Sequence, residues 1–142
     1  MRFMKRTILL VMTLVFMSFI LLGCQSEDSN VLHLDGEIIK VSISKSEGFA
    51  KLNSDYFAVF THEETLKTFR SVISSSIKEE GIVDMVEPEF DLEVIYENGN
   101  KQGFHIWVGK KGQISTLMKI DDTHTVYTVS GEMTNKLIAL IQ

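Results

Sequence analysis

The stretch Phe90-Asp91-Leu92-Glu93-Val94-Ile95-Tyr96-Glu97-Asn98-Gly99 predicts a strand followed by a tight turn. Apolar side chains stand at every second position from 90 to 96, as in a strand with one buried face. Asn98-Gly99 is a turn signal, because glycine adopts the left-handed conformation that hairpin turns need. Phe104, Ile106 and Val108 then resume the alternation. Together these residues predict an antiparallel hairpin.

The register of this hairpin follows from the two apolar faces. They share one core only if the turn holds an odd number of residues, so we expect a three-residue loop, Glu97-Asn98-Gly99. This register pairs Leu92 with Phe104 and Phe90 with Ile106. A two-residue Asn98-Gly99 turn would instead set Trp107 opposite Phe90 and Ile106 opposite Asp91.

Elements on both sides of the hairpin follow from similar patterns. A strand is expected within 36–45, with Ile39, Val41 and Ile43 on its buried face, and another at 56–60. A capping box formed by Thr61 and Glu64 starts a helix that carries Leu66, Phe69, Ile73 and Ile77 and stops at Gly81. Further strands are expected at 114–120 and 125–129, and a last helix, capped by Ser130, carries Met133, Leu137, Ile138 and Ile141.

The predicted order is strand, strand, helix, four strands, helix. This order indicates the α+β class: an antiparallel sheet with both helices packed on one face.

The N-terminal segment has the pattern of a secretory signal. Arg2, Lys5 and Arg6 precede the largely apolar run Thr7–Leu22. As a helix this run would span ~24 Å, less than the ~30 Å of a hydrocarbon core, so a spanning helix is the weaker interpretation. Cys24 is the only cysteine, so the chain forms no internal disulfide.

Leu21-Leu22-Gly23-Cys24 resembles the lipobox of bacterial lipoproteins. The resemblance implies cleavage between Gly23 and Cys24, a diacylglyceryl group on the Cys24 sulfur, and acylation of the new amino group by a fatty acid such as palmitate. The alternative is an ordinary signal peptide or membrane helix with an incidental cysteine. We therefore expect a signal peptide at 1–23, a lipidated cysteine and flexible tether at 24–30, and one domain at 31–142. The protein would sit on the extracytoplasmic side of the cell membrane.

Charge limits the partners of the mature chain. The 119 residues after Gly23 carry all 19 acidic side chains and 11 of the 14 Lys and Arg, so their formal net charge is −8. This charge argues against nucleic acid, whose binding depends on Lys and Arg contacts to phosphate. It also argues against a domain lying flat on anionic lipid. The lipid anchor would hold the protein to the membrane.

An acidic face on the hairpin is the candidate binding site. Asp91 and Glu93 share one face of the first strand with Glu87 and Glu89, and the predicted register sets His105 and Trp107 across from them. Such a face could hold a cation, a cationic ligand or a sugar, with Trp107 as a stacking surface and His105 paired with Asp91 or Glu93. The alternative is a solvated acidic face with a partly covered tryptophan.

The sequence gives little support for a zinc site or a catalytic serine. His62-Glu63-Glu64-Thr65-Leu66 starts like a zinc-protease helix but has leucine where the second histidine belongs. Two serine–lysine patterns, at 42–45 and 75–78, lack the further motifs of penicillin-binding enzymes. We predict no catalytic residue, no metal site and no cofactor beyond the lipid on Cys24.

The mature region resembles the uncharacterised YhfM-like lipoproteins of Gram-positive bacteria. The resemblance covers 38–141 and is carried by Phe104-His105-Ile106-Trp107-Val108 and Thr123-His124-Thr125-Val126-Tyr127. It implies no activity. The expected function is a non-enzymatic module that binds a small ligand or an envelope protein. The alternatives are an accessory subunit of a membrane complex and an envelope hydrolase that uses dispersed carboxylates.

Overall fold

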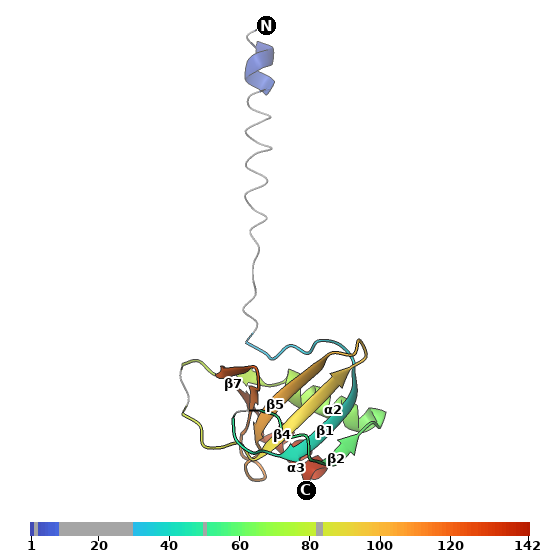
Figure 1. The fold of residues 1–142 in the computed structure, drawn as a ribbon. Helices are drawn as coiled ribbons and strands as arrows, with labels where there is room; N and C mark the ends of the chain where they lie inside the picture. The colour runs from blue at the N-terminus through green and yellow to red at the C-terminus, as the bar shows by residue number, and fades with distance from the viewer. Residues whose placement is uncertain (2, 9–29, 50, 82–83) are drawn as a thin grey trace.

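The computed structural model describes residues 1, 3–8, 30–49, 51–81 and 84–142 (Figure 1). Residues 3–8 are helical. The rest of the predicted signal segment, the Leu21–Cys24 motif and the tether up to residue 29 lie outside the described residues. Within the described ranges, none of the helices combines the length and hydropathy needed to span a membrane.

A single seven-stranded sheet forms the centre of the domain, and all its neighbouring strands are antiparallel. The order across the sheet is β2-β1-β4-β5-β6-β7-β3. The strands are β1 (Ile38–Lys45), β2 (Tyr56–Phe60), β3 (Ile77–Lys78), β4 (Phe90–Tyr96), β5 (Lys101–Trp107), β6 (Ser115–Lys119) and β7 (Asp122–Val129). The predicted α+β class and element order are confirmed, with the two-residue β3 as an addition.

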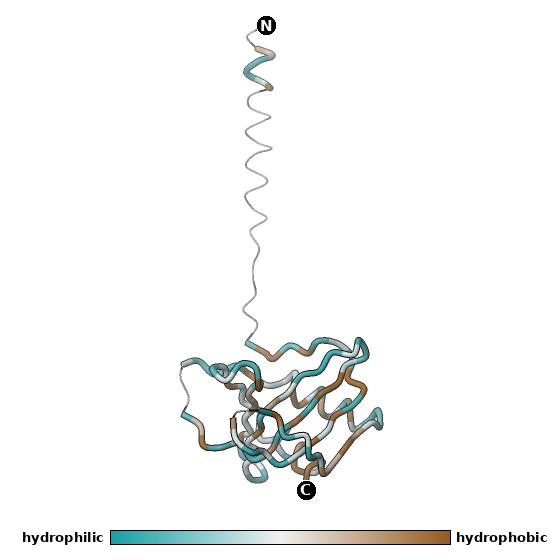
Figure 2. The backbone as a smooth tube through the Cα atoms, in the orientation of Figure 1, coloured by the Kyte–Doolittle hydropathy of each residue, from teal (hydrophilic) through white to brown (hydrophobic). Residues whose placement is uncertain are grey.

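The hairpin of β4 and β5 has the predicted register. Leu92 pairs with Phe104 and Phe90 with Ile106, so the three-residue turn is correct. Gly99 has φ +87°, and its N–H donates to the carbonyl of Tyr96. Figure 2 shows that the turn is hydrophilic between two more hydrophobic strands.

Two helices cover one face of the sheet, as predicted: α2 (Glu63–Ser74) and α3 (Gly131–Ile141). Phe69 and Leu137 from these helices share one buried cluster with Val94, Phe104 and other side chains of the sheet. The Ser130 hydroxyl accepts a hydrogen bond from the N–H of Met133, so the predicted cap of α3 is confirmed.

Both ends of α2 differ from the prediction. The N-cap is His62 rather than Thr61, and no side chain caps the helix, so the expected capping box is wrong. The helix ends at Ser74, well before Gly81. The hydroxyls of Ser75 and Ser76 donate to the carbonyls of Val72 and Ile73, at 3.1 and 2.6 Å. Local serine bonds of this kind satisfy the terminal carbonyls and compete with a further helical turn. Ile77 consequently lies in β3, 55% exposed.

The alternation predicted for β1 is broken by a β-bulge. Between Ile38 and Lys40 the register with β4 shifts by one residue, which leaves Ile39 without a partner in β4. Val41 and Ile43 are fully buried, as predicted, but Ile39 is 47% exposed. Because of the extra residue, the side chains before the bulge point to the opposite faces from those that simple alternation predicts. Ile38 therefore lies in the core in place of Ile39.

Residues 30–37, here called the strap, run along one end of the sheet before β1 (Figure 1). The carbonyl of Asn30 accepts a hydrogen bond from the N–H of Lys78, and Val31 forms an antiparallel bridge with Ile77. At the other end of the strap, the carbonyl of Glu37 accepts from the N–H of Glu97. Leu32 anchors the strap in the main core. Asn30 is thus already bonded to the sheet.

Candidate functional site

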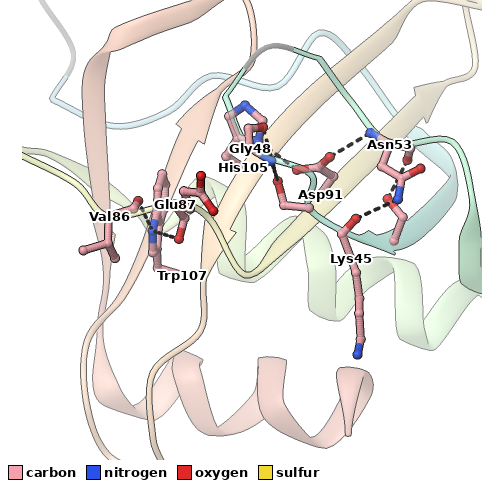
Figure 3. Close-up of polar contacts among 10 residues, drawn as sticks. Lys45, Gly48, Asn53, Val86, Glu87, Asp91, His105 and Trp107 are labelled. Carbon is pink, nitrogen blue, oxygen red and sulfur yellow. Dashed lines mark hydrogen bonds and ion pairs between the residues drawn. The ribbon is translucent and has the colours of Figure 1, made fainter.

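The second face of the sheet holds the predicted site residues. Alternation along β4 brings Asp91 and Glu93 to the face opposite the helices, and the register sets His105 next to Asp91. Glu93 instead has Gly103 across from it. The structure therefore brings Asp91, His105 and Trp107 together around one part of this face (Figure 3).

Asp91 and His105 form a buried pair. His105 Nδ1 lies 2.8 Å from Asp91 Oδ1, and both side chains are completely inaccessible to solvent. The other carboxylate oxygen of Asp91 accepts a hydrogen bond of 2.7 Å from the N–H of Asn53. The pairing of His105 with Asp91, rather than with Glu93, is thus decided. Since Asp91 is the acceptor, we assign the imidazole proton to Nδ1.

The second ring nitrogen of His105 has no such partner. Among the described residues, His105 Nε2 and Ser42 Oγ are the buried side-chain polar atoms that lack a hydrogen bond. The Phe49 ring packs against the imidazole in a T-shaped arrangement, with ring centroids 5.8 Å apart and ring planes at 79°. An imidazole held by a carboxylate at Nδ1 is the geometry of a general base. In this conformation Phe49 closes it from solvent.

Residues 46–49 and 51–55 cover this part of the sheet, and we call them the covering segment. Asn53 fastens the segment: its side-chain amide donates to the carbonyl of Lys45, and its own carbonyl accepts from the Ser44 hydroxyl. Leu52 packs so closely over Gly103 that an added Cβ there would lie 3.1 Å from its methyl carbon. The alternative of a solvated acidic face is therefore wrong for Asp91, because a polar loop folds back over it, whereas Glu87 and Glu89 are exposed.

Trp107 is covered as well, with 8% of its surface exposed. Its indole N–H donates to the carbonyls of Val86 and Glu87, at 2.9 and 3.1 Å. Met85 packs against the small cluster that Trp107 forms with Met118 and Val126. The indole thus offers no open stacking face for a sugar.

Glu93 lies apart from this group, toward the edge of the sheet. Burial, followed by the charge of Glu93, raises the pKa of Tyr56. The four predicted residues are therefore not one binding surface. In the part of the chain that the structure describes, no three His, Cys, Asp or Glu side chains are grouped to hold a metal ion.

Two surface hollows are lined entirely by described residues. One, of about 380 Å³, lies beside β1 and α2, and its charged side chains pair with one another: Glu63 with Lys67 at 2.8 Å and Glu37 with Arg70 at 3.0 Å. The other, of about 350 Å³, lies under the strap and is called the strap hollow. Its lining residues are His33, Leu34, Asp35, Tyr96, Lys101, Gln102, Lys119 and Asp121.

The floor of the strap hollow is ordered by a buried tyrosine. Tyr96 is inaccessible to solvent, and its hydroxyl donates to Gln102 Oε1 at 2.6 Å. Burial raises the pKa of Tyr96, and the backbone of Asp35 lowers it by less. The phenol therefore stays neutral and holds Gln102 in place.

Sequence reasoning missed the residues that close one site and form the other. Phe49 and Asn53 stand in a polar loop without periodicity, and their contacts join positions far apart in the chain, such as Asn53 and Asp91, which are 38 positions apart. The strap hollow combines the strap with the ends of β4, β5 and β6. The available signal was the short apolar group Val31, Leu32 and Leu34, which follows the polar tether.

The fold and the buried pair define a small α+β protein with an antiparallel sheet and helices on one face. The family model described as YhfM protein matches residues 34–142. The chain belongs to this family.

Further comparisons bear on the fold alone. A crystal structure of a thioesterase-like protein from Clostridium sporogenes superposes with a TM-score of 0.57 at 21% identity, covering 73% of this chain and 94% of that one. No match is found among curated proteins.

Proposed function

We propose that this protein is a lipoprotein held on the outer side of the cell membrane by Cys24, and that it acts as a non-enzymatic binding module. The observation that carries the proposal is the spacing between Cys24 and the domain. Asn30, six residues after Cys24, is already hydrogen-bonded to Lys78. Six residues reach at most ~20 Å, so a lipid on Cys24 would keep the domain close to the bilayer.

Lipidation is also the role that best suits the lone cysteine. The mature net charge of −8 repels an anionic membrane surface, so the domain itself supplies little attraction. A diacylglyceryl group brings two chains, and stable anchoring requires more than one acyl chain.

Burial of the Asp91–His105 pair supports a binding role over hydrolysis. Both side chains are inaccessible, and Phe49 lies against the imidazole. A substrate cannot reach His105 without displacing this side chain. The 8% exposure of Trp107 likewise disfavours docking on a membrane complex through the indole. The strap hollow is open and lined by both charged and apolar groups, as a ligand site requires.

Replacing Cys24 tests the anchor. In Cys24→Ala the sulfur that would carry the lipid is gone, so we expect the protein to move from the membrane fraction to the soluble extracytoplasmic fraction. Ser26→Ala, two residues away, should remain in the membrane fraction. Fractionation, mass spectrometry of the mature N-terminus and labelling with a fatty-acid analogue give the readouts. A Cys24→Ala protein that loses its signal yet stays membrane-bound would overturn the proposal.

A further inference from the structure

We propose that the strap hollow binds the head group of a zwitterionic membrane phospholipid, a phosphate ester that carries a primary amine. This inference rests on the proposed function, because the anchor would hold the hollow beside the bilayer. His33, Leu34 and Asp35 line it from the strap, and His33 is nine residues after Cys24. Nine extended residues reach at most ~30 Å, so a lipid head group lies within range.

Two lysines supply the phosphate-binding groups. Lys101 begins β5 and Lys119 ends β6, and the antiparallel pairing of β5 with β6 brings these two strand ends to the same end of the sheet, where both residues line the hollow. Among the described residues, neither ammonium group forms an ion pair with a carboxylate. In the other hollow, Lys67 and Arg70 are both paired. Lys101 and Lys119 are therefore available to an anionic group, and two ammonium groups suit a phosphate.

Two carboxylates add negative charge to the lining of the hollow. Asp35 and Asp121 are both exposed and both line the hollow. Asp35 is oriented by the side-chain amide of Asn100. A ligand with phosphate alone would meet these carboxylates as like charges, whereas a primary amine can donate to them. The mixed charge of the lining therefore favours a zwitterion over an anion.

The floor and size of the hollow suit a short polar group. Leu34 provides apolar surface beside the charges, and the hydroxyl of the buried Tyr96 fixes Gln102. The volume of about 350 Å³ falls at the lower end of the range for small-molecule sites. The net charge of the mature chain also favours a zwitterion. A charge of −8 repels anionic lipid but not a lipid head group without net charge.

Glycerophosphoethanolamine is the soluble probe for this site. We would titrate it into the 15N-labelled full chain in nonionic detergent and follow amide resonances by NMR. We expect saturable shifts at Lys101, Gln102, Lys119 and Asp121. Glycerophosphocholine, which has no N–H donor, and glycerol 3-phosphate, which has no amine, should bind several-fold more weakly. Absence of shifts at these amides, or equal affinity for glycerol 3-phosphate, would overturn the inference.

Charge-matched variants separate the site from a general effect of charge. Lys101→Gln/Lys119→Gln should weaken the affinity for glycerophosphoethanolamine at least tenfold. Lys110→Gln/Lys111→Gln makes the same change of charge in the turn between β5 and β6, and should leave the affinity within twofold. Asp35→Asn/Asp121→Asn should abolish the preference for the amine while phosphate binding persists. Equal losses in both lysine variants, or a retained amine preference in the aspartate variant, would contradict the assignment.

Vesicles distinguish a membrane head group from a free metabolite. For the lipidated full chain, amide exchange at 101–102 and 119–121 should be slower in vesicles that contain phosphatidylethanolamine than in phosphatidylcholine alone. Equal exchange in both would exclude the membrane as the source. The soluble titration needs no anchor, so its outcome is independent of the Cys24→Ala result.

Discussion

The Asp91–His105 pair is the most constrained polar contact on the second face of the sheet. Asp91 accepts hydrogen bonds from the His105 ring and from the backbone N–H of Asn53. Asp91 and His105 are fully buried, and Asn53 is partly buried. Removing one partner of a buried pair leaves the other unsatisfied, and this is more destabilising than removing both. The pair therefore fastens the covering segment to the sheet.

A double-mutant cycle tests this coupling. We expect Asp91→Leu to lower the free energy of unfolding by about 3–5 kcal/mol, because His105 and the Asn53 N–H lose their acceptor. The double variant Asp91→Leu/His105→Phe should lose less than the sum of the two single variants, with a coupling of about 1–3 kcal/mol. Urea unfolding gives these values. Asp55→Leu, at an exposed carboxylate in the same segment, is the control, and strictly additive losses would show that the pair is not coupled.

Among the elements, the two helices begin in different ways. Ser130 caps α3 through its side chain, whereas α2 begins after His62 without a side-chain cap. Both helices follow a residue that is a good N-cap by type, Ser130 in one case and Thr61 in the other. Residue type thus does not decide capping. The backbone must also hold the hydroxyl within reach of the first-turn N–H groups.

This difference predicts unequal effects of the same kind of substitution. Ser130→Ala should lower the free energy of unfolding by about 1 kcal/mol, because the N–H of Met133 loses its acceptor. Thr61→Ala should change it by less than about 0.5 kcal/mol, since no cap bond is lost. Thermal and urea unfolding of the two variants side by side provide the measurement. If Thr61→Ala lowered the free energy of unfolding as much as Ser130→Ala, Thr61 would have to cap α2 in solution.

In the whole molecule, the sheet is covered on both faces, but by different means. The helices cover one face with a continuous apolar core, while the covering segment and Met85 close part of the other. Phe49 belongs to the covering segment and packs against Trp107, with the two ring centroids 6.0 Å apart. Phe49 is itself 37% exposed, so it separates the indole from solvent as a single layer.

Tryptophan fluorescence reports directly on this cover, since Trp107 is the only tryptophan. Phe49→Ala should expose the indole, which raises acrylamide quenching and shifts the emission to longer wavelength. Phe57→Ala is the matched control, because the ring of Phe57 packs in an edge-to-face arrangement with that of Phe90, away from Trp107. Unchanged quenching in Phe49→Ala would mean that other residues keep the second face closed.

Local patterns in the sequence were sufficient for the central hairpin and for the cap of α3. The alternation of β4 and β5, the Glu97–Gly99 turn and the Ser130 cap depend on neighbours within a few positions, and all three agree with the structure. The early end of α2 also has a local cause, in Ser75 and Ser76, although the apolar spacing up to Ile77 hid it.

Only the tertiary structure revealed what surrounds the candidate sites. The bulge at Ile39, the closing of the Asp91–His105 pair and the strap hollow each depend on contacts between distant segments. Alternation assigns a side chain to a face of the sheet, but it does not tell whether that face meets water or a folded loop. Long-range packing decides this, because the energy of covering a polar pair depends on partners such as Asn53 and Phe49, whose positions the local pattern leaves open.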